Sequence, residues 1–249
     1  MAWFWPVPVA VGLWWLSTLT LLWRLRLPAK TYPNTLRAVS AILALGIICI
    51  SISSDRADAM GALLAFIGAL AIWSWHEASY FFGIISGPRP RACPPNATAW
   101  QRFRYGVKAS LYHELLIVLT AIALFALLRN TENQIAAQAF VVLWLMRWST
   151  KLNIFVGVNN LHSKFWPDHL RYLESYVGAA VNRVFPLSLM LAAALAFWLL
   201  QPVLSSQYSQ FDIVSASLLL TLLALAIVEH VFLLVRVPDD ALWSLSKKN

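Results

Sequence analysis

The sequence predicts an all-α membrane protein, a polytopic bundle of about seven transmembrane helices. Of its 249 residues, 60% are apolar and only 12% are charged, whereas roughly a quarter of the residues in a soluble domain are charged. The mean hydropathy is +0.66. The apolar residues gather in seven runs that reach or approach the about 20 residues needed to cross a hydrocarbon core. Together these observations predict burial in membrane lipid.

The first three helices are expected at 3–23, 36–53 and 58–82. The first run is too long for the apolar region of a signal peptide and lacks a preceding basic segment, so it is interpreted as a retained helix. The second run is the shortest. The Asp-Arg-Ala-Asp sequence at 55–58 indicates a tight turn into the third helix.

Four further helices are expected, and nothing in the composition divides the chain, so 1–249 is interpreted as a single membrane domain. The fifth run is the least regular because Arg147 and Lys151 fall within it. A basic pair inside an apolar run is costly in lipid unless it is paired. The four runs cover 105–128, 135–157, 184–204 and 211–236.

Two connecting segments are longer than the rest. Residues 83–104 are rich in Gly and Pro, which predicts an ordered or extended loop with little helix. Residues 167–181 begin with Pro167 at a plausible first helical position. Apolar residues then recur at helical spacing, which predicts a short helix at the membrane interface.

The basic residues set the orientation. Seventeen of the nineteen Lys and Arg residues lie after, or late in, the first, third, fifth and seventh helices, and only Arg56 and Arg129 lie in the alternate loops. The positive-inside rule therefore places the N-terminus outside and the C-terminus in the cytoplasm. The net charge of +8 is spread over short loops, which argues against a nucleic-acid partner.

Three His/Glu dipeptides lie inside apolar runs, where an ionisable side chain marks a site or a buried structural pair. They are His76-Glu77, His113-Glu114 and Glu229-His230, in the third, fourth and seventh helices. At 1.5 Å per residue, all three lie roughly 8–14 Å below the cytoplasmic interface. The sequence thus predicts one layer of imidazoles and carboxylates shared by three helices.

This layer allows two interpretations. Carboxylate and imidazole are ligands of iron, manganese and zinc, and helical bundles build such sites from facing helices; isolated histidines can instead ligate a haem or the magnesium of a chlorophyll-type pigment. In the second interpretation, the three glutamates form buried ion pairs with Arg147, Lys151 and Lys108 that fix helix register. Further ligands or hydrogen bonds could come from Asn153, Asn159, Asn160, His162 and His169.

Motifs of common enzyme classes are absent from the sequence. It contains no HExxH or HxxxH histidine pattern, no Walker A loop, no GxGxxG, no GxSxG and no CxxC. The two cysteines, Cys49 and Cys93, predict no disulfide framework. Catalysis therefore has no motif-based support.

Three segments carry a family resemblance: GPRPRACPPNATAWQRFRYGVKASLYHELLIVL, MRWSTKLNIFVGVNNLHSKFWPDHLRYLESY and EHVFLLVRVPDDALWSL. With these motifs the chain resembles the PuhE family, photosynthetic-complex assembly proteins of purple phototrophic bacteria, from about the third helix to the end. The resemblance implies a multi-pass protein of the bacterial photosynthetic inner membrane. The polar framework it implies consists of His76, Glu77, His113, Glu114, Arg147, Lys151, Asn153, Asn160, His169, Glu229 and His230.

Three functions follow as hypotheses. The resemblance implies an assembly factor for the reaction centre and light-harvesting complex, which binds partner subunits or a pigment and is linked to bacteriochlorophyll supply. The His/Glu layer favours instead a membrane metalloenzyme, similar to an iron oxygenase, acting on a tetrapyrrole or carotenoid precursor. A transporter has the least support, because no inverted repeat or pair of broken helices is visible.

Overall fold

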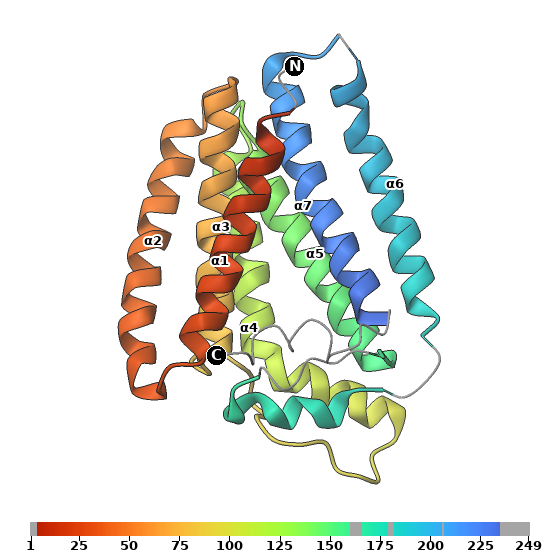
Figure 1. Cartoon of the computed structure of the whole chain (residues 1–249). Helices are drawn as coiled ribbons and strands as arrows, with labels where there is room; N and C mark the ends of the chain where they lie inside the picture. The colour runs from red at the N-terminus through yellow and green to blue at the C-terminus, as the bar shows by residue number, and fades with distance from the viewer. Residues whose placement is uncertain (1–3, 160–165, 179–181, 206, 235–249) are drawn as a thin grey trace, which may run out of the picture.

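The computed structural model describes residues 4–159, 166–178, 182–205 and 207–234, and this part of the chain confirms the predicted all-α class (Figure 1). Within these ranges, seven helices are long and apolar enough to cross a membrane. Two 3₁₀ segments accompany them, η1 (Ala29–Thr31) and η3 (Asp168–Tyr176). The seven helices are α1 (Pro6–Leu25), α2 (Tyr32–Ser53), α3 (Ala59–Phe81), α4 (Ala99–Leu128), α5 (Ile135–Val156), α6 (Val184–Leu204) and α7 (Gln210–Leu234).

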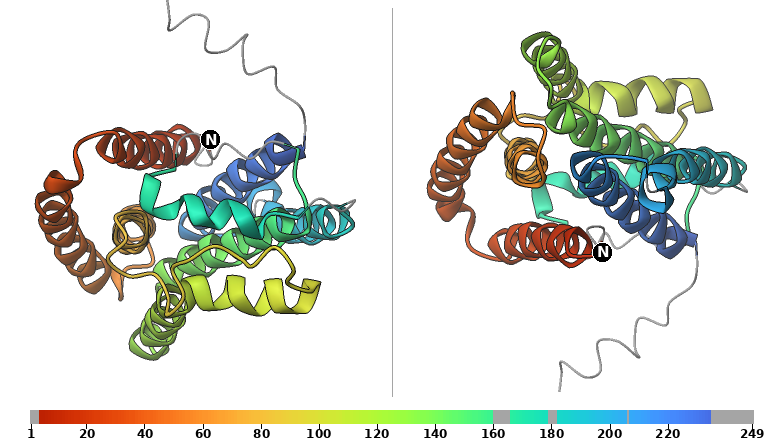
Figure 2. Two further views of the ribbon diagram at one scale, coloured as in Figure 1. Left: turned by 90° about the horizontal axis from the view of Figure 1, so that it is seen from below. Right: turned by 90° about the horizontal axis from the view of Figure 1, so that it is seen from above.

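Helices α3, α5 and α7 contact one another at the centre of the bundle, and the other four lie around them (Figure 2). The most apolar stretch of α3 is 61% buried and that of α7 is 50% buried, against 11% for both α1 and α6. An apolar helix that stays exposed in this way presents its surface to lipid. The bundle therefore has an interior made chiefly by three helices.

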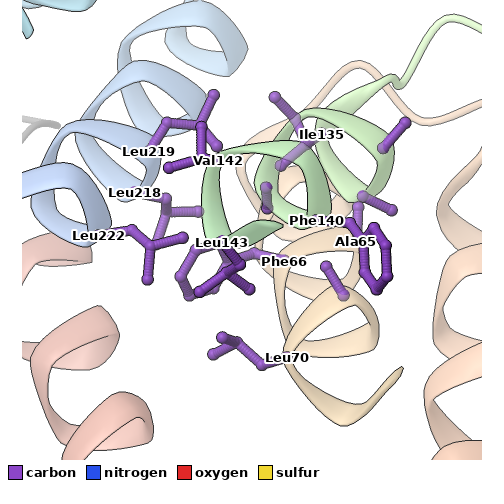
Figure 3. Close-up of a cluster of buried hydrophobic side chains, with 14 of the residues drawn as sticks. Ala65, Phe66, Leu70, Ile135, Phe140, Val142, Leu143, Leu218, Leu219 and Leu222 are labelled. Carbon is purple, nitrogen blue, oxygen red and sulfur yellow. The ribbon is translucent and has the colours of Figure 1, made fainter. Parts of the chain in front are cut away.

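The packed core joins these three helices. Phe66 of α3, Phe140 of α5 and Leu218 of α7 are fully buried, and Figure 3 shows their side chains between the three ribbons. In lipid, such close packing holds helices together mainly by van der Waals contact. The core fixes the relative positions of the helices that carry Glu77, Arg147 and the other polar residues of the predicted layer.

Two helix starts are set by side-chain caps. Asp58 accepts a hydrogen bond from the backbone N–H of Gly61 at 2.6 Å, which begins α3. Thr98 and Gln101 form a capping box that begins α4 at Ala99. The prediction of a loop over 83–104 was therefore too long, because α4 starts six residues before the predicted 105.

The short helix predicted at 167–181 is present as the 3₁₀ segment η3 over Asp168–Tyr176. Residues 179–181 lie outside the described ranges. Figure 1 shows η3 at the same end of the bundle as η1 and the loop after α3. This is the end where the basic connections gather, and the orientation of that end toward the cytoplasm stays a prediction.

Candidate functional site

Two partly buried ion pairs occupy the predicted polar layer. Arg147 of α5 donates from Nη1 to Oε2 of Glu77 on α3 at 2.5 Å, and Lys151 of α5 donates from Nζ to Oε1 of Glu114 on α4. Arg147 and Lys151 are four residues apart, so they lie on one face of α5. Two of the three glutamates therefore have the cation partners of the ion-pair interpretation.

Aromatic rings of α3 make cation–π contacts with the two cations. The Arg147 guanidinium carbon lies 5.5 Å from the ring centroid of Tyr80 and 5.7 Å from that of Phe81, both on α3. The Lys151 ammonium lies 5.2 Å from the Tyr80 centroid. These cation–π distances add to the attraction of the carboxylates. Tyr80 and Phe81 thus complete a cation site that helix α3 presents to α5.

The histidines of α3 and α4 are buried side by side. His76 Nε2 is hydrogen-bonded to Thr120 Oγ1 at 3.0 Å. The His113 ring lies 6.2 Å from the His76 ring and 4.6 Å from the Tyr80 ring. Within the described chain, both ring nitrogens of His113 and Nδ1 of His76 are buried without a hydrogen-bond partner. Three nitrogens without a partner in the described chain thus lie on two neighbouring imidazole rings.

The loop after α3 touches α4 at this histidine. The backbone N–H of His113 donates to the carbonyl of Ser86 at 3.0 Å. A Cβ at Gly87 would lie 2.1 Å from the carbonyl oxygen of Lys108. The absence of a side chain at Gly87 is therefore what lets the loop lie against the α4 backbone.

Helix α7 meets the layer differently. His230 Nδ1 lies 2.8 Å from the Ala226 carbonyl and its Nε2 lies 2.8 Å from Ser149 Oγ of α5. Since a carbonyl only accepts, Nδ1 carries the proton in a neutral ring and Nε2 accepts from Ser149. Glu229 accepts from Trp14 Nε1 of α1 at 3.3 Å. Its partner is an indole and not the predicted Lys108.

The six residues predicted as metal ligands are distributed over these separate contacts. Among the residues that the structure describes, no three His, Cys, Asp or Glu side chains gather closely enough to hold a metal ion. Glu77 and Glu114 face cations, and Glu229 and His230 face α1 and α5. Of these six residues, only His76 and His113 lie next to each other with ring nitrogens that have no hydrogen-bond partner in the described chain.

The residues predicted near the cytoplasmic end of α5 join helices to one another. Asn153 donates to the carbonyl of Ser149 and, at 3.1 Å, to Ser188 Oγ of α6. His169 of η3 is hydrogen-bonded at 3.0 Å to the carbonyl of Phe81, at the end of α3. These contacts give Asn153 and His169 structural partners. Asn160 and His162 lie outside the described residues.

Further bonds secure η3 beneath the bundle. The backbone N–H of Cys93 donates to Ser175 Oγ at 2.8 Å, and the hydroxyl of Tyr176 donates to the Arg91 carbonyl at 2.8 Å. Burial raises the pKa of the Tyr176 hydroxyl, so it remains a donor at neutral pH. The loop after α3 and η3 therefore form one connected layer across the end of the helices.

Two cavities flank the ion pairs. The first, here called the α1 cavity, has a volume of about 540 Å³ and is lined by α1, α2, α3, α5 and α7, with Trp14, Glu77 and Glu229 in its wall. The second, here called the α4 cavity, has a volume of about 490 Å³ and is lined by α3, α4, α5 and η3. Arg147 lines both cavities. The charged residues of α5 thus separate two spaces of ligand size.

The sequence interpretation missed several residues of this site. None of Trp14, Tyr80, Thr120 and Ser149 was predicted from the sequence as part of the site. Each is a hydrogen-bonding or aromatic residue in an apolar helix, at the level of a charged residue on another helix. Comparing depths for all polar and aromatic residues, rather than for ionisable ones only, could have found them.

Comparison with known proteins gives the family. Residues 1–249 match the DUF3623 family, which is described as "Protein of unknown function". A protein of Rhodobacter capsulatus, described as an uncharacterized 30.4 kDa protein in the puhA 5′ region, is 33% identical over 240 residues, which cover 94% of this chain and 87% of the relative. No solved structure matches the chain. The match over the full length means that the chain belongs to the DUF3623 family.

Proposed function

We propose that the protein is a membrane factor in the assembly of the photosynthetic reaction centre and its light-harvesting complex. The observation that carries this proposal is the relative from the puhA 5′ region, whose similarity extends over 94% of this chain. The resemblance to the PuhE family supports the same pathway and a location in the photosynthetic inner membrane. A link to bacteriochlorophyll supply belongs to this proposal.

The α1 cavity is the place we assign to the pigment or partner helix. Its wall is mostly apolar, and Glu229 is exposed there with Trp14 as its hydrogen-bond partner. A carboxyl group at this depth in lipid favours a function in recognition. Glu77 and Arg147, also in the wall, are already paired with each other, which favours binding over chemistry.

Affinity purification from phototrophically grown cells in a gentle detergent tests the proposal. Reaction-centre or light-harvesting subunits, or bacteriochlorophyll seen by its absorbance, should accompany the wild-type protein. Trp14→Ala and Glu229→Gln should reduce that yield. Trp198→Ala is the matched control, because Trp198 lies exposed on α6 and lines neither cavity. A wild-type protein that is always alone and colourless would contradict the proposal.

A membrane metalloenzyme, with iron as the first metal to test, is the second candidate. The observation that favours it is the pair His76 and His113, whose three buried nitrogens have no partner in the described chain. Elemental analysis of gently purified protein should then find at least one metal equivalent, lost in His113→Ala. Less than one equivalent in the wild type, with normal growth of His76→Ala cells, would exclude it.

A further inference from the structure

In each ion pair, the exposed fractions of the two side chains show which of them is more accessible. In the pair of Lys151 with Glu114, the lysine side chain is 30% exposed and the glutamate side chain 11%. In the pair of Arg147 with Glu77, the values are 19% and 12%. The second carboxylate oxygens, Glu77 Oε1 and Glu114 Oε2, are fully buried. In both pairs the cation is therefore the more accessible partner.

The described charged residues that line the α4 cavity are Arg147, Lys151 and Glu114. Arg147 and Lys151 are paired with Glu77 and Glu114, so the four charges balance, and the cavity meets the more exposed, cationic member of each pair. Lys151 lines the α4 cavity and not the α1 cavity. A molecule that enters here meets the Lys151 ammonium group in a largely apolar, aromatic space, where a charge interacts more strongly than in water.

The lining of the α4 cavity suits a molecule with one polar end and one apolar end. Phe103, Trp148 and Phe155 contribute aromatic surface, and Leu170 and Leu173 of η3 cover one end. Bonds to the loop after α3 and to the end of α3 hold η3 in this position. Lys151 is five residues before the end of α5, about 7.5 Å at the helical rise. That depth is within reach of lipid head groups.

We propose that the α4 cavity binds a membrane amphiphile with an acidic head group. The head group contacts Lys151 and Arg147, and the hydrocarbon chain lies along the aromatic wall. Glu114 stays behind Lys151 as its counter-ion. This inference follows from the exposure of the two cations and from the apolar, aromatic lining of the cavity, and it does not depend on the proposed role in assembly.

Native mass spectrometry of delipidated full-length protein tests the proposal with three probes: oleate, dioleoylphosphatidylglycerol and dioleoylphosphatidylcholine. One equivalent of an acidic probe should bind about tenfold more tightly than phosphatidylcholine, as expected for one charge-assisted hydrogen bond. The oleate and phosphatidylglycerol arms show whether a carboxylate or a phosphate is preferred. Equal affinities for all three probes would overturn the proposal.

Variants connect the binding to the cavity. Lys151→Gln should weaken acidic-probe binding about tenfold, and Lys151→Arg should retain it. Lys108→Gln is the matched control, since Lys108 is an exposed lysine of α4 that does not line the cavity. Wild-type binding by Lys151→Gln would refute the assignment.

A second variant covers the case in which Lys151→Gln does not fold. Gly106 is in α4 and lines the cavity, and a Cβ there would meet Tyr176 at an ordinary 3.5 Å. Gly106→Leu adds a good helix former and fills the space. It should lose at least about tenfold in acidic-probe affinity, whereas unchanged binding would overturn the proposal.

Discussion

Breaking the ion pair between Glu77 and Arg147 should show how strongly α3 and α5 depend on each other. Glu77→Leu leaves a guanidinium that is 19% exposed and has lost its carboxylate, and such a loss costs about 3–5 kcal/mol. Arg147→Met should cost a similar amount. The free energy of unfolding of the double variant should lie within about 2 kcal/mol of the wild-type value, because an apolar pair can replace an ion pair at little cost. The double variant loses only the contacts of Arg147 with the Tyr80 and Phe81 rings.

Unfolding in mixed detergent–SDS micelles, followed by circular dichroism, measures these differences as a double-mutant cycle. The expected coupling energy is at least about 2 kcal/mol. The pair of Trp14 with Glu229 is the matched control, since its hydrogen bond is long, at 3.3 Å, and exposed. Trp14→Phe and Glu229→Leu should couple by about 1 kcal/mol or less. Additive effects for Glu77→Leu and Arg147→Met would refute the reasoning.

Three further changes test the elements that position the site. Gly87→Ala places a Cβ 2.1 Å from the Lys108 carbonyl oxygen and should destabilise the protein by about 1–3 kcal/mol in the same unfolding assay. His169→Ala removes the bond from η3 to α3 and should speed hydrogen exchange in η3 without lowering the unfolding midpoint by more than a small amount. Arg56 lowers the pKa of Asp58, so the cap on α3 stabilises above the unfolded pKa of about 3.9 and is lost as pH falls below it; Asp58→Asn should abolish this acid dependence.

Hydropathy and charge alternation were sufficient to predict the helices, because a bilayer demands long apolar runs and biases where lysine and arginine lie. The start of α4 was predicted six residues late, since polar residues 99–104 are helical outside the apolar run and only the capping box marks where they begin. The short helix η3 was predicted from the spacing of its apolar residues, but its bonds to distant residues such as Cys93 were not, because no local pattern reveals them.

The sequence was sufficient to predict the depth of the site residues in the bundle, but not which residue each of them contacts. Counting residues from helix ends brought His76, Glu77 and Glu114 to one level, and the structure places all three beside α5. Which residue pairs with which depends on the rotation of each helix about its axis. Glu229 shows the difference, because its level was expected from the sequence but its contact with Trp14 of α1 was not.

The composition of helix α5 gives a physical reason for the two ion pairs. It is the least hydropathic of the seven spans, with a mean hydropathy of 1.3, and it carries Arg147 and Lys151. On an isolated helix, two such cations would oppose insertion by up to roughly 5–7 kcal/mol. Glu77 of α3 and Glu114 of α4 neutralise both of them, and both glutamates precede α5 in the chain. We therefore expect stable insertion of α5 to depend on helices that precede it in the chain, and the same pairing leaves Arg147 in the walls of both cavities and Lys151 in the wall of the α4 cavity.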